Sequence, residues 1–306
     1  MAKASPATKK EPSKSEPVKK EPIKDFFKDV VFVLVAFFFL NSFVLASFEV
    51  PTGSMENEIM AGDFLFVNKF LYGGTTPRNI PFTNVRLPWF RVPAIRDVER
   101  GDVIVFEFPG QRDEVVSPEC WFYLKRAVAL SGDTLEVVNR ALYVNGKASP
   151  IPRNMKFNDY TIKPRGQGEY SIFPPGAPYN EDNWGPMVVP KKGDVIQLSA
   201  DNFEQWRTFI GREGHTTFVD APGRVLVDGA PASSYTVERN YIFGMGDNRD
   251  NSLDSRFWGF IPEDNIVGTP MIVYWSWSPD IPLFDLSMLP SKLASIRFSR
   301  IGTLIK

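Results

Sequence analysis

The chain has 306 residues and a mass of 34.6 kDa, enough for one large domain or two smaller ones with a sizeable core. Its net charge of −1 provides no overall field that would attract nucleic acid. The single cysteine, Cys120, excludes a disulfide framework and leaves the redox compartment open. We interpret Cys120 as a small, half-buried structural residue.

Residues 1–24 carry seven lysines against three glutamates, with proline and serine between them. Such a segment cannot bury enough apolar surface to fold. The sequence therefore predicts a disordered basic tail over 1–24, and whether this tail binds a partner stays open.

An uncharged apolar run of 19 residues, Val30–Phe48, follows the tail. As a helix it would span about 28 Å, close to the ~30 Å thickness of the hydrocarbon core. The alternative is a cleaved secretory signal, because small residues occur near Ala46, but the run exceeds the ~7–15 residues of a signal core. We predict a retained single-pass anchor over 25–48, with a cytoplasmic N-terminus and residues 49–306 outside, at the plasma (inner) membrane.

The part of the chain after the anchor has the pattern of a mostly β protein. Gly-Asp occurs five times and suits tight turns. Four of these pairs introduce strand-like runs, at Phe64–Val67, Val103–Phe106, Thr134–Val137 and Val195–Leu198. Asn145-Gly146 adds a hairpin signal after Ala141–Val144. No long segment outside the anchor shows a helical period, and the proline-rich residues 148–192 predict an irregular insertion.

The fifth Gly-Asp pair, Gly246-Asp247, is followed by a polar run to Arg256 instead of a strand. Apolar segments flank this run, Tyr241–Phe243 before it and Phe257–Phe260 after it. A solvated loop would explain the charges alone. A polar loop held between packed segments is also typical of a rigid functional site.

Elimination narrows the chemistry that the chain could perform. The only histidine, His215, lies in a glycine-rich loop, so metal sites built on paired histidines are excluded. We interpret His215 as a surface bystander. Ser54 follows Gly53 just beyond the apolar run and could be a nucleophile, although Gly-Ser turns are common in loops. Its base would then be another group, such as a lysine with a lowered pKa.

Lys125 is a candidate for that base. A strand over 121–130 places it on one face with Tyr123, Ala127 and Ala129, where the ammonium would be poorly hydrated. The alternative is an edge-strand lysine that protects against aggregation. Composition alone does not decide between the two.

Taken together, the segments resemble the bacterial type I signal peptidases (leader peptidases), which are membrane-anchored serine proteases with a Ser/Lys dyad. The residues that carry the resemblance, in the order of that family, are Val50–Met55, Gly62–Lys69, Arg100–Ile104, Tyr123–Ala127 with Ser131–Asp133, and Gly246–Arg256. The resemblance covers the anchor, residues 49–137 and residues 238–275, and leaves the middle of the chain unassigned.

The resemblance implies a fold of coiled antiparallel sheets, with a catalytic domain formed by 49–137 and 236–306 and a variable β-rich subdomain inserted over 138–235. It implies an endopeptidase that removes signal peptides from exported preproteins at the membrane lipid surface. We expect the protein itself to be a monomer. Cleavage would follow small residues of the Ala-x-Ala type. Neither a metal nor an organic cofactor is implied, and no nucleic acid is expected as a partner.

The resemblance also implies roles for individual residues. Ser54 would be the nucleophile and Lys125 the general base. The Ser54 backbone N–H and the side chain of Thr52, where many family members have serine, would form the oxyanion hole. Ser252 would hydrogen-bond the Lys125 amine and orient it.

The remaining implied residues support the site or contact the substrate. Asp254 and Arg256 would form an ion pair, and Tyr123 and Gly246 would shape the wall. The apolar residues that would line shallow substrate pockets are Val50, Pro51, Ile59 and Leu124. Two alternatives stay open: a Ser/Lys protease with one dedicated substrate, and a non-catalytic, anchored β-rich binding module.

Overall fold

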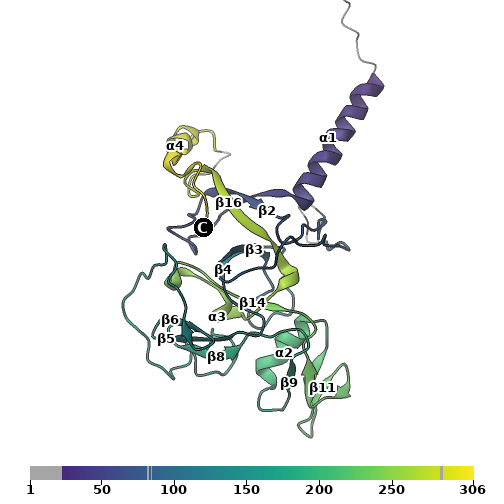
Figure 1. Cartoon of the computed structure of the whole chain (residues 1–306), viewed down its shortest axis with the longest axis vertical. Helices are drawn as coiled ribbons and strands as arrows, with labels where there is room; N and C mark the ends of the chain where they lie inside the picture. The colour runs from purple at the N-terminus through teal and green to yellow at the C-terminus, as the bar shows by residue number, and fades with distance from the viewer. Residues whose placement is uncertain (1–22, 81–82, 84, 283–284) are drawn as a thin grey trace, which may run out of the picture. The chain divides into compact units, whose positions relative to one another are not determined.

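The structure is a computed structural model that describes residues 23–80, 83, 85–282 and 285–306. The basic tail predicted over 1–24 therefore lies almost entirely outside the described residues. Contacts divide the chain into two compact units, one ending at Phe39 and one running from Leu40 to Lys306. Figure 1 shows the chain with its labelled elements.

Helix α1 (Ile23–Phe43) contains the segment Asp25–Phe43, which is long and apolar enough to cross a membrane by length and composition alone. The helix is shorter than the predicted anchor of 25–48. The end of the apolar run forms strand β1 (Leu45–Glu49), whose burial alternates along the strand. The main chain of β1 pairs with a later strand, and this pairing ends the helix at Phe43 although the apolar composition continues.

The catalytic candidate residues lie on or beside a seven-stranded antiparallel sheet. Its strands, in spatial order, are β1, β2 (Asp63–Asn68), β16 (Ile266–Ser276), β3 (Val103–Glu107), β4 (Phe122–Leu130), β14 (Tyr241–Met245) and β15 (Ile261–Pro262). The register shifts where β16 meets β2 and β3, and again where β14 meets β4. Such bulges bend strands and increase their twist, so the sheet curls. The predicted mostly β fold is confirmed.

A second group of strands lies in the middle of the chain. A four-stranded sheet has the order β7 (Lys147–Ala148), β6 (Ala141–Val144), β5 (Thr134–Val138) and β8 (Trp184–Val188). Two smaller sheets join β10 (Thr217–Val219), β11 (Val225–Val227) and β12 (Ala230–Pro231), and β13 (Ser234–Thr236) with β9 (Val195–Gln197). Asn145 and Gly146, with φ of 53° and 73°, connect β6 to β7 as the predicted hairpin turn.

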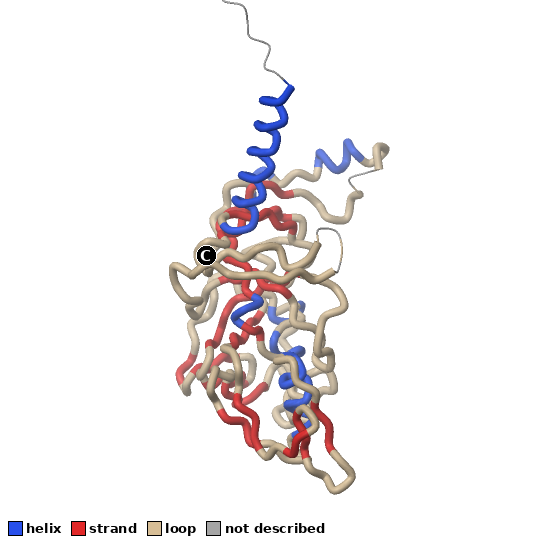
Figure 2. Tube along the Cα trace, turned by 90° about the vertical axis from the view of Figure 1, so that its right-hand side faces the viewer, coloured by secondary structure: helices blue, strands red, loops and turns tan. Residues whose placement is uncertain are grey.

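Residues 149–183 form neither helix nor strand. The irregular insertion predicted over 148–192 is wrong at its two ends, because Ala148 belongs to β7 and Trp184–Val188 form β8. Figure 2 shows the strands in red with loops in tan between them. Within the described residues, three helices after α1 were not predicted: α2 (Phe203–Arg212), α3 (Ser255–Trp258) and α4 (Leu289–Ala294). Short 3-10 turns occur at Arg249–Asn251, Glu263–Asn265 and Phe298–Arg300. α2 buries Phe203, Phe209 and Ile210, but ten residues are too short for its period to stand out in the sequence.

Two of the hydrophobic clusters position the site. One joins the predicted insertion to the main sheet, because Trp184 and Leu135 pack in the same cluster as Phe243 of β14 and Ala129 of β4. The other lies beneath the segment that carries Ser54 and includes Val50, Met55 and Ile59 together with Val105 and Val267. Packing thus holds the segment that carries Ser54 from below and joins β4 and β14 to the predicted insertion.

Candidate active site

Ser54 lies in the turn-rich segment between β1 and β2, and this segment is closed at its base by backbone hydrogen bonds. Val50 and Asp63 pair there at 2.9 Å. The side chains of Met55 and Ile59 are 1% and 0% exposed and fix the segment in the core below. Ser54 itself is buried, with 8% of its surface exposed. The loop therefore presents the serine hydroxyl from a rigid base.

Lys125 lies in the middle of β4 and its amine contacts the Ser54 hydroxyl. The distance from Lys125 Nζ to Ser54 Oγ is 2.8 Å, although the residues are 71 positions apart. β4 is paired on both sides, with Ile104 of β3 opposite Lys125 and with β14 on the other edge. Lys125 is therefore on an internal strand, and the alternative of an edge-strand lysine does not hold.

Burial lowers the pKa of the Lys125 amine to about 8, because only 3% of the residue is exposed and the charged form is poorly hydrated. The charge of Arg256 lowers the pKa further, whereas the carboxylates of Asp254 and Asp247 raise it. At pH 7 about a tenth of the amine is then neutral, far more than for a lysine of ordinary pKa. The neutral amine can accept the hydroxyl proton of Ser54 across the same 2.8 Å contact.

The loop after β14 is built around a buried ion pair between Asp254 and Arg256. Arg256 donates from Nε and Nη2 to the Asp254 carboxylate, each at 2.9 Å, and both side chains are at most 3% exposed. Asp254 also accepts the backbone N–H of Gly246 at 3.1 Å. Arg256 Nη2 donates to the carbonyl of Arg249 at 2.7 Å. The pair thus folds the polar run back on itself beside β14.

Gly246 packs between Ser54 and Ser252. A Cβ at Gly246 would lie 2.2 Å from Ser252 Oγ and 2.6 Å from the carbonyl oxygen of Ser54, closer than real Cβ atoms approach. Ser252 is thus next to the dyad, but the expected hydrogen bond to Lys125 is not formed. Within the described residues its buried Oγ has no hydrogen-bond partner.

The residues expected to contact the substrate differ in exposure. Pro51 and Thr52 are exposed, and neither the Ser54 N–H nor the Thr52 hydroxyl makes a hydrogen bond to the described part of the protein. Leu124 is half-buried and Val50 is 7% exposed. Ile59 is fully buried, so it supports the wall from behind and presents no surface of its own.

Tyr123 lies on the same side of β4 as Lys125. Its ring centre is 5.5 Å from Lys125 Nζ, and the ring stacks on Phe108 at 4.3 Å. These two aromatic rings form an apolar wall that limits hydration of the amine.

His215, the residue that a Ser-His-Asp triad would need, makes its ring contacts elsewhere. Its nitrogens bond the carboxylates of Asp228 at 2.6 Å and Glu238 at 2.9 Å. Across the residues that the structure describes, no cluster of His, Cys, Asp and Glu is arranged to hold a metal.

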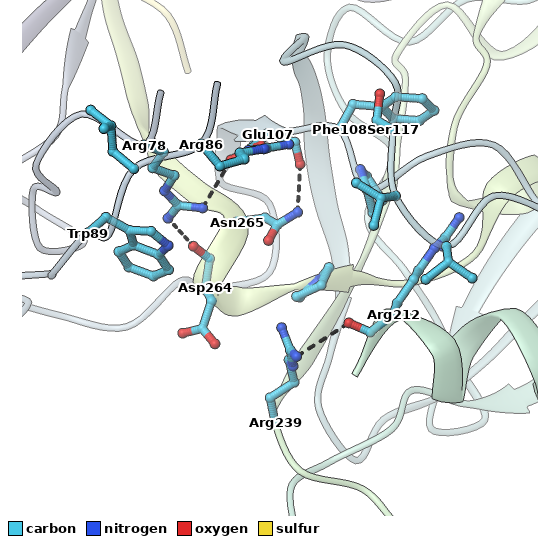
Figure 3. Close-up of a pocket in the computed structure, with 15 residues that line it drawn as sticks. Arg78, Arg86, Trp89, Glu107, Phe108, Ser117, Arg212, Arg239, Asp264 and Asn265 are labelled. Atoms are coloured by element: carbon cyan, nitrogen blue, oxygen red, sulfur yellow. Dashed lines mark hydrogen bonds and ion pairs between the residues drawn. The ribbon is translucent and has the colours of Figure 1, made fainter. Parts of the chain in front are cut away.

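A cavity of about 370 Å³ lies away from the dyad, and its arginines have structural partners (Figure 3). Arg78 bonds Glu107 at 3.2 Å. Arg212 donates to the carbonyls of Gly110 and Gln111 at 2.9 and 2.6 Å. The Arg78 contact joins a loop to β3, and the Arg212 contacts join α2 to the loop after β3. Neither Ser54 nor Lys125 lines the cavity.

Sequence reasoning did not single out Asn248, although it lies within the polar run. It is fully buried, and its backbone N–H donates to the Ser54 carbonyl at 3.0 Å. Its side-chain amide donates to the Gly53 carbonyl at 3.0 Å. An amide flanked by charged residues carries no distinct sequence signal, so only the structure identifies it.

Comparison with known proteins first defines the class, which is a peptidase. The model of the family described as "Signal peptidase, peptidase S26" matches residues 23–275. The chain belongs to this family.

The curated relatives identify a particular member of this class, because they carry the name signal peptidase I. The chain is 28% identical to that of Aquifex aeolicus, over 90% of this chain and 95% of the relative. It is 30% identical to that of Pseudomonas aeruginosa, over 91% and 77%, and 32% identical to that of Haemophilus influenzae, over 80% and 67%. A solved signal peptidase I from Enterococcus faecalis has 19% identity and a TM-score of 0.28, covering 57% of this chain and 98% of its own. The assignment rests on the sequence matches.

Proposed function

We propose that this protein is a membrane-bound serine endopeptidase that removes signal peptides from exported preproteins, with Ser54 as nucleophile and Lys125 as general base. Membership of the signal peptidase family supports removal of signal peptides in general. The observation that supports the dyad is the 2.8 Å contact between a buried amine of lowered pKa and a serine hydroxyl.

The proposed reaction proceeds in two halves. The neutral Lys125 amine takes the proton of Ser54 Oγ as the oxygen attacks the carbonyl carbon before the scissile bond. The resulting ammonium gives that proton to the departing amine, and an acyl-enzyme remains. Lys125 then takes a proton from water, which attacks the ester and releases the signal peptide while the proton returns to Ser54.

The negative charge that develops on the substrate carbonyl oxygen needs donors on the open side of Ser54. The Ser54 N–H and the Thr52 hydroxyl are suitable because the protein itself leaves both without a partner within the described residues. Thr52 keeps the hydroxyl of serine but adds a methyl group that restricts its rotamers.

The proposed preference for small side chains follows from the apolar residues beside Ser54. Val50 and Leu124 leave little exposed surface, and Ile59 fills the space behind them. Long side chains would have to displace core residues, at a cost of typically ~1–3 kcal/mol.

The apolar helix α1 fits an anchor that holds this site near the bilayer, since Ser54 lies 11 positions after the helix ends at Phe43 (54 minus 43). We propose that the N-terminus is cytoplasmic, that residues 49–306 are extracytoplasmic, and that the substrate lies in the same membrane. Tethering enzyme and substrate to one surface raises their effective concentration.

The test is cleavage of a synthetic peptide that spans a signal-peptide junction, with the product mass showing a cut after a small residue. We expect Ser54→Ala and Lys125→Ala each to abolish turnover. Lys125→Arg should be equally inactive, because a guanidinium is not deprotonated at usable pH. Ser287→Ala and Lys191→Ala, at exposed positions, are matched controls that should cleave normally. Turnover by either dyad variant would refute the proposal.

A further inference from the structure

A short piece of the irregular stretch between β7 and β8 is bonded to the loop that follows β14. The backbone N–H of Lys156 donates to the carbonyl of Asp247 at 2.9 Å, and the N–H of Arg249 donates to the carbonyl of Lys156 at 3.0 Å. Lys156 therefore pairs with Asn248 as a parallel β-bridge. This piece of the predicted insertion is thus attached directly to the catalytic side of the protein.

The Lys156 side chain extends the attachment to the segment that carries Ser54. Its Nζ bonds Glu56 Oε2 at 2.7 Å, and the same oxygen accepts the side-chain amide of Asn248 at 3.2 Å. Asn248 in turn holds the carbonyls of Gly53 and Ser54, each at 3.0 Å. We call Lys156, Glu56 and Asn248 the latch. Through the Glu56 Oε2 atom, the latch links the insertion, the segment that carries Ser54 and the loop after β14.

Neighbouring contacts keep the latch in place. The side-chain amide of Asn158 donates to Asn248 Oδ1 at 3.0 Å, which fixes the orientation of the Asn248 amide. The backbone N–H groups of Asn158 and Asp159 donate to Asp250 Oδ2 at 2.6 and 2.8 Å. The side-chain amide of Asn154 donates to the carboxylate of Glu58, which lies in the segment that carries Ser54.

The exposure of the ion pair indicates what the latch contributes. The side chains of Lys156 and Glu56 are 26% and 38% exposed, and ion pairs that contact water add little to stability. Asn248, by contrast, is fully buried and reaches the backbone of Ser54 itself. The ion pair therefore contributes mainly by fixing the position of Glu56, and only little by adding to the stability of the fold.

Building on the proposed function, we propose that Lys156 is a positioning residue that holds Ser54 Oγ in reach of the Lys125 amine. Without its ammonium, Glu56 loses a charged partner and turns toward water, and Asn248 loses the acceptor that it shares with Lys156. The carbonyls of Gly53 and Ser54 are then less firmly held. A small misplacement of reacting atoms is costly even when every catalytic group is present.

The first test compares Lys156→Met with Lys163→Met in the full chain. Lys163 is a matched control because it lies in the same irregular stretch and its ion pairs are with Glu169 and Glu181, at 2.6 and 2.9 Å. We expect Lys156→Met to lower kcat about tenfold with KM nearly unchanged. Lys156→Arg should restore most of the rate, and Lys163→Met should match the wild type. Equal kcat for the two methionine variants would overturn the proposal.

The second test is hydrogen exchange, which does not depend on activity. The amides of Asn248 and Ile59, which bond the carbonyls of Ser54 and Met55, should exchange faster in Lys156→Met and not in Lys163→Met. Unchanged exchange would count against the latch. If Lys156→Met does not fold, Glu56→Gln removes the same ion pair from the other side and is measured in the same way.

These outcomes separate the two proposals. If Ser54→Ala or Lys125→Ala retains turnover, the proposed function fails, whatever the exchange data show. If the dyad variants are inactive while Lys156→Met has normal kcat and normal exchange, only the latch fails.

Discussion

A lowered lysine pKa does not by itself identify a catalytic residue in this protein. Burial lowers the pKa of Lys69 to about 8, as it does for Lys125, and the charges of Arg78 and Arg91 add to the effect. Lys69 Nζ donates to the backbone carbonyl of Asn41 at 3.2 Å, whereas Lys125 Nζ contacts a hydroxyl. The difference lies in the partner, because a carbonyl has no proton to give and a serine hydroxyl has one.

The pKa of Lys125 makes a prediction about the pH dependence of cleavage. The amine acts as a base only when neutral, so kcat/KM should rise with pH, with an apparent pKa near 8, and level off above it. Below pH 8 the rate should fall about tenfold per pH unit, because the neutral fraction does. Rates on a soluble junction peptide between pH 6 and 10, with circular dichroism confirming an intact fold, provide the measurement. A rate independent of pH from 6 to 9 would contradict the assignment of Lys125 as the base.

At the scale of elements, the site depends on how the chain leaves β14. Gly246 follows the strand directly, its N–H bonds Asp254, and its α-carbon faces both Ser54 and Ser252. The ion pair of Asp254 with Arg256 then returns the chain to α3. Because both charges are buried and mutually satisfied, removal of either would leave the other unpaired, at a cost of typically ~3–5 kcal/mol.

Gly246→Ala tests this arrangement by adding a methyl group where there is no room for one, without removing any hydrogen-bonding group. The added Cβ would lie 2.6 Å from the Ser54 carbonyl, so we expect the serine to shift and kcat to fall by about two orders of magnitude while the fold is retained. Cleavage rates and a thermal melt measure the two effects.

A second substitution identifies which contact matters. Ser252→Gly added to Gly246→Ala removes the contacts at 2.2 and 2.5 Å but leaves the one with the Ser54 carbonyl. The double variant should therefore recover only part of the activity. Wild-type activity of Gly246→Ala alone would show that the serine is not held by this contact.

Local sequence patterns predicted where strands form. The features that were missed depend on pairing between residues far apart in the sequence. Gly-Asp turns preceded β2, β3, β5 and β9 because turn chemistry is a property of adjacent residues. The end of α1 at Phe43 depends on pairing of β1 with β2, which apolar composition does not reveal. The hydrogen bond from Ser252 to Lys125, expected from the resemblance alone, is not formed.

In the candidate site, too, residues with a local sequence signal were predicted and residues that depend on distant partners were not. Ser54 and Lys125 were predicted from a turn and an alternating strand, with family resemblance deciding between open alternatives, and the structure brings them to 2.8 Å. The latch could not be predicted, because Lys156 meets Asn248 across 92 positions (248 minus 156) from a stretch without periodicity. An isolated lysine among prolines carries no signal until its partner is known.

At the scale of the whole molecule, the second unit contains all the proposed catalytic machinery. Leu40–Lys306 includes the main sheet, the dyad and the latch, and the insertion shares a hydrophobic cluster with β4 and β14. The first unit consists, in its described part, of the apolar helix up to Phe39, whose side chains are largely exposed, such as Phe32 at 72% and Phe37 at 68%. Exposed apolar side chains of this kind suit lipid and not water.

Removal of residues 1–39 should therefore separate the cleavage reaction itself from the encounter with a membrane-bound substrate. A variant that begins at Leu40 keeps the hydrogen bonds of Lys69 to the carbonyls of Asn41 and Val44. The pairing between the start of β1 and the end of β2 therefore stays intact. In detergent, we expect it to cleave a short, soluble junction peptide at a rate within about twofold of the full chain, because the dyad is unchanged. With a preprotein reconstituted in lipid vesicles, the full chain should be faster by ~10²-fold or more, because enzyme and substrate share one surface. Equal rates in vesicles would show that α1 does not act as a tether, and a slow reaction with the soluble peptide would show that the first unit supports the site itself.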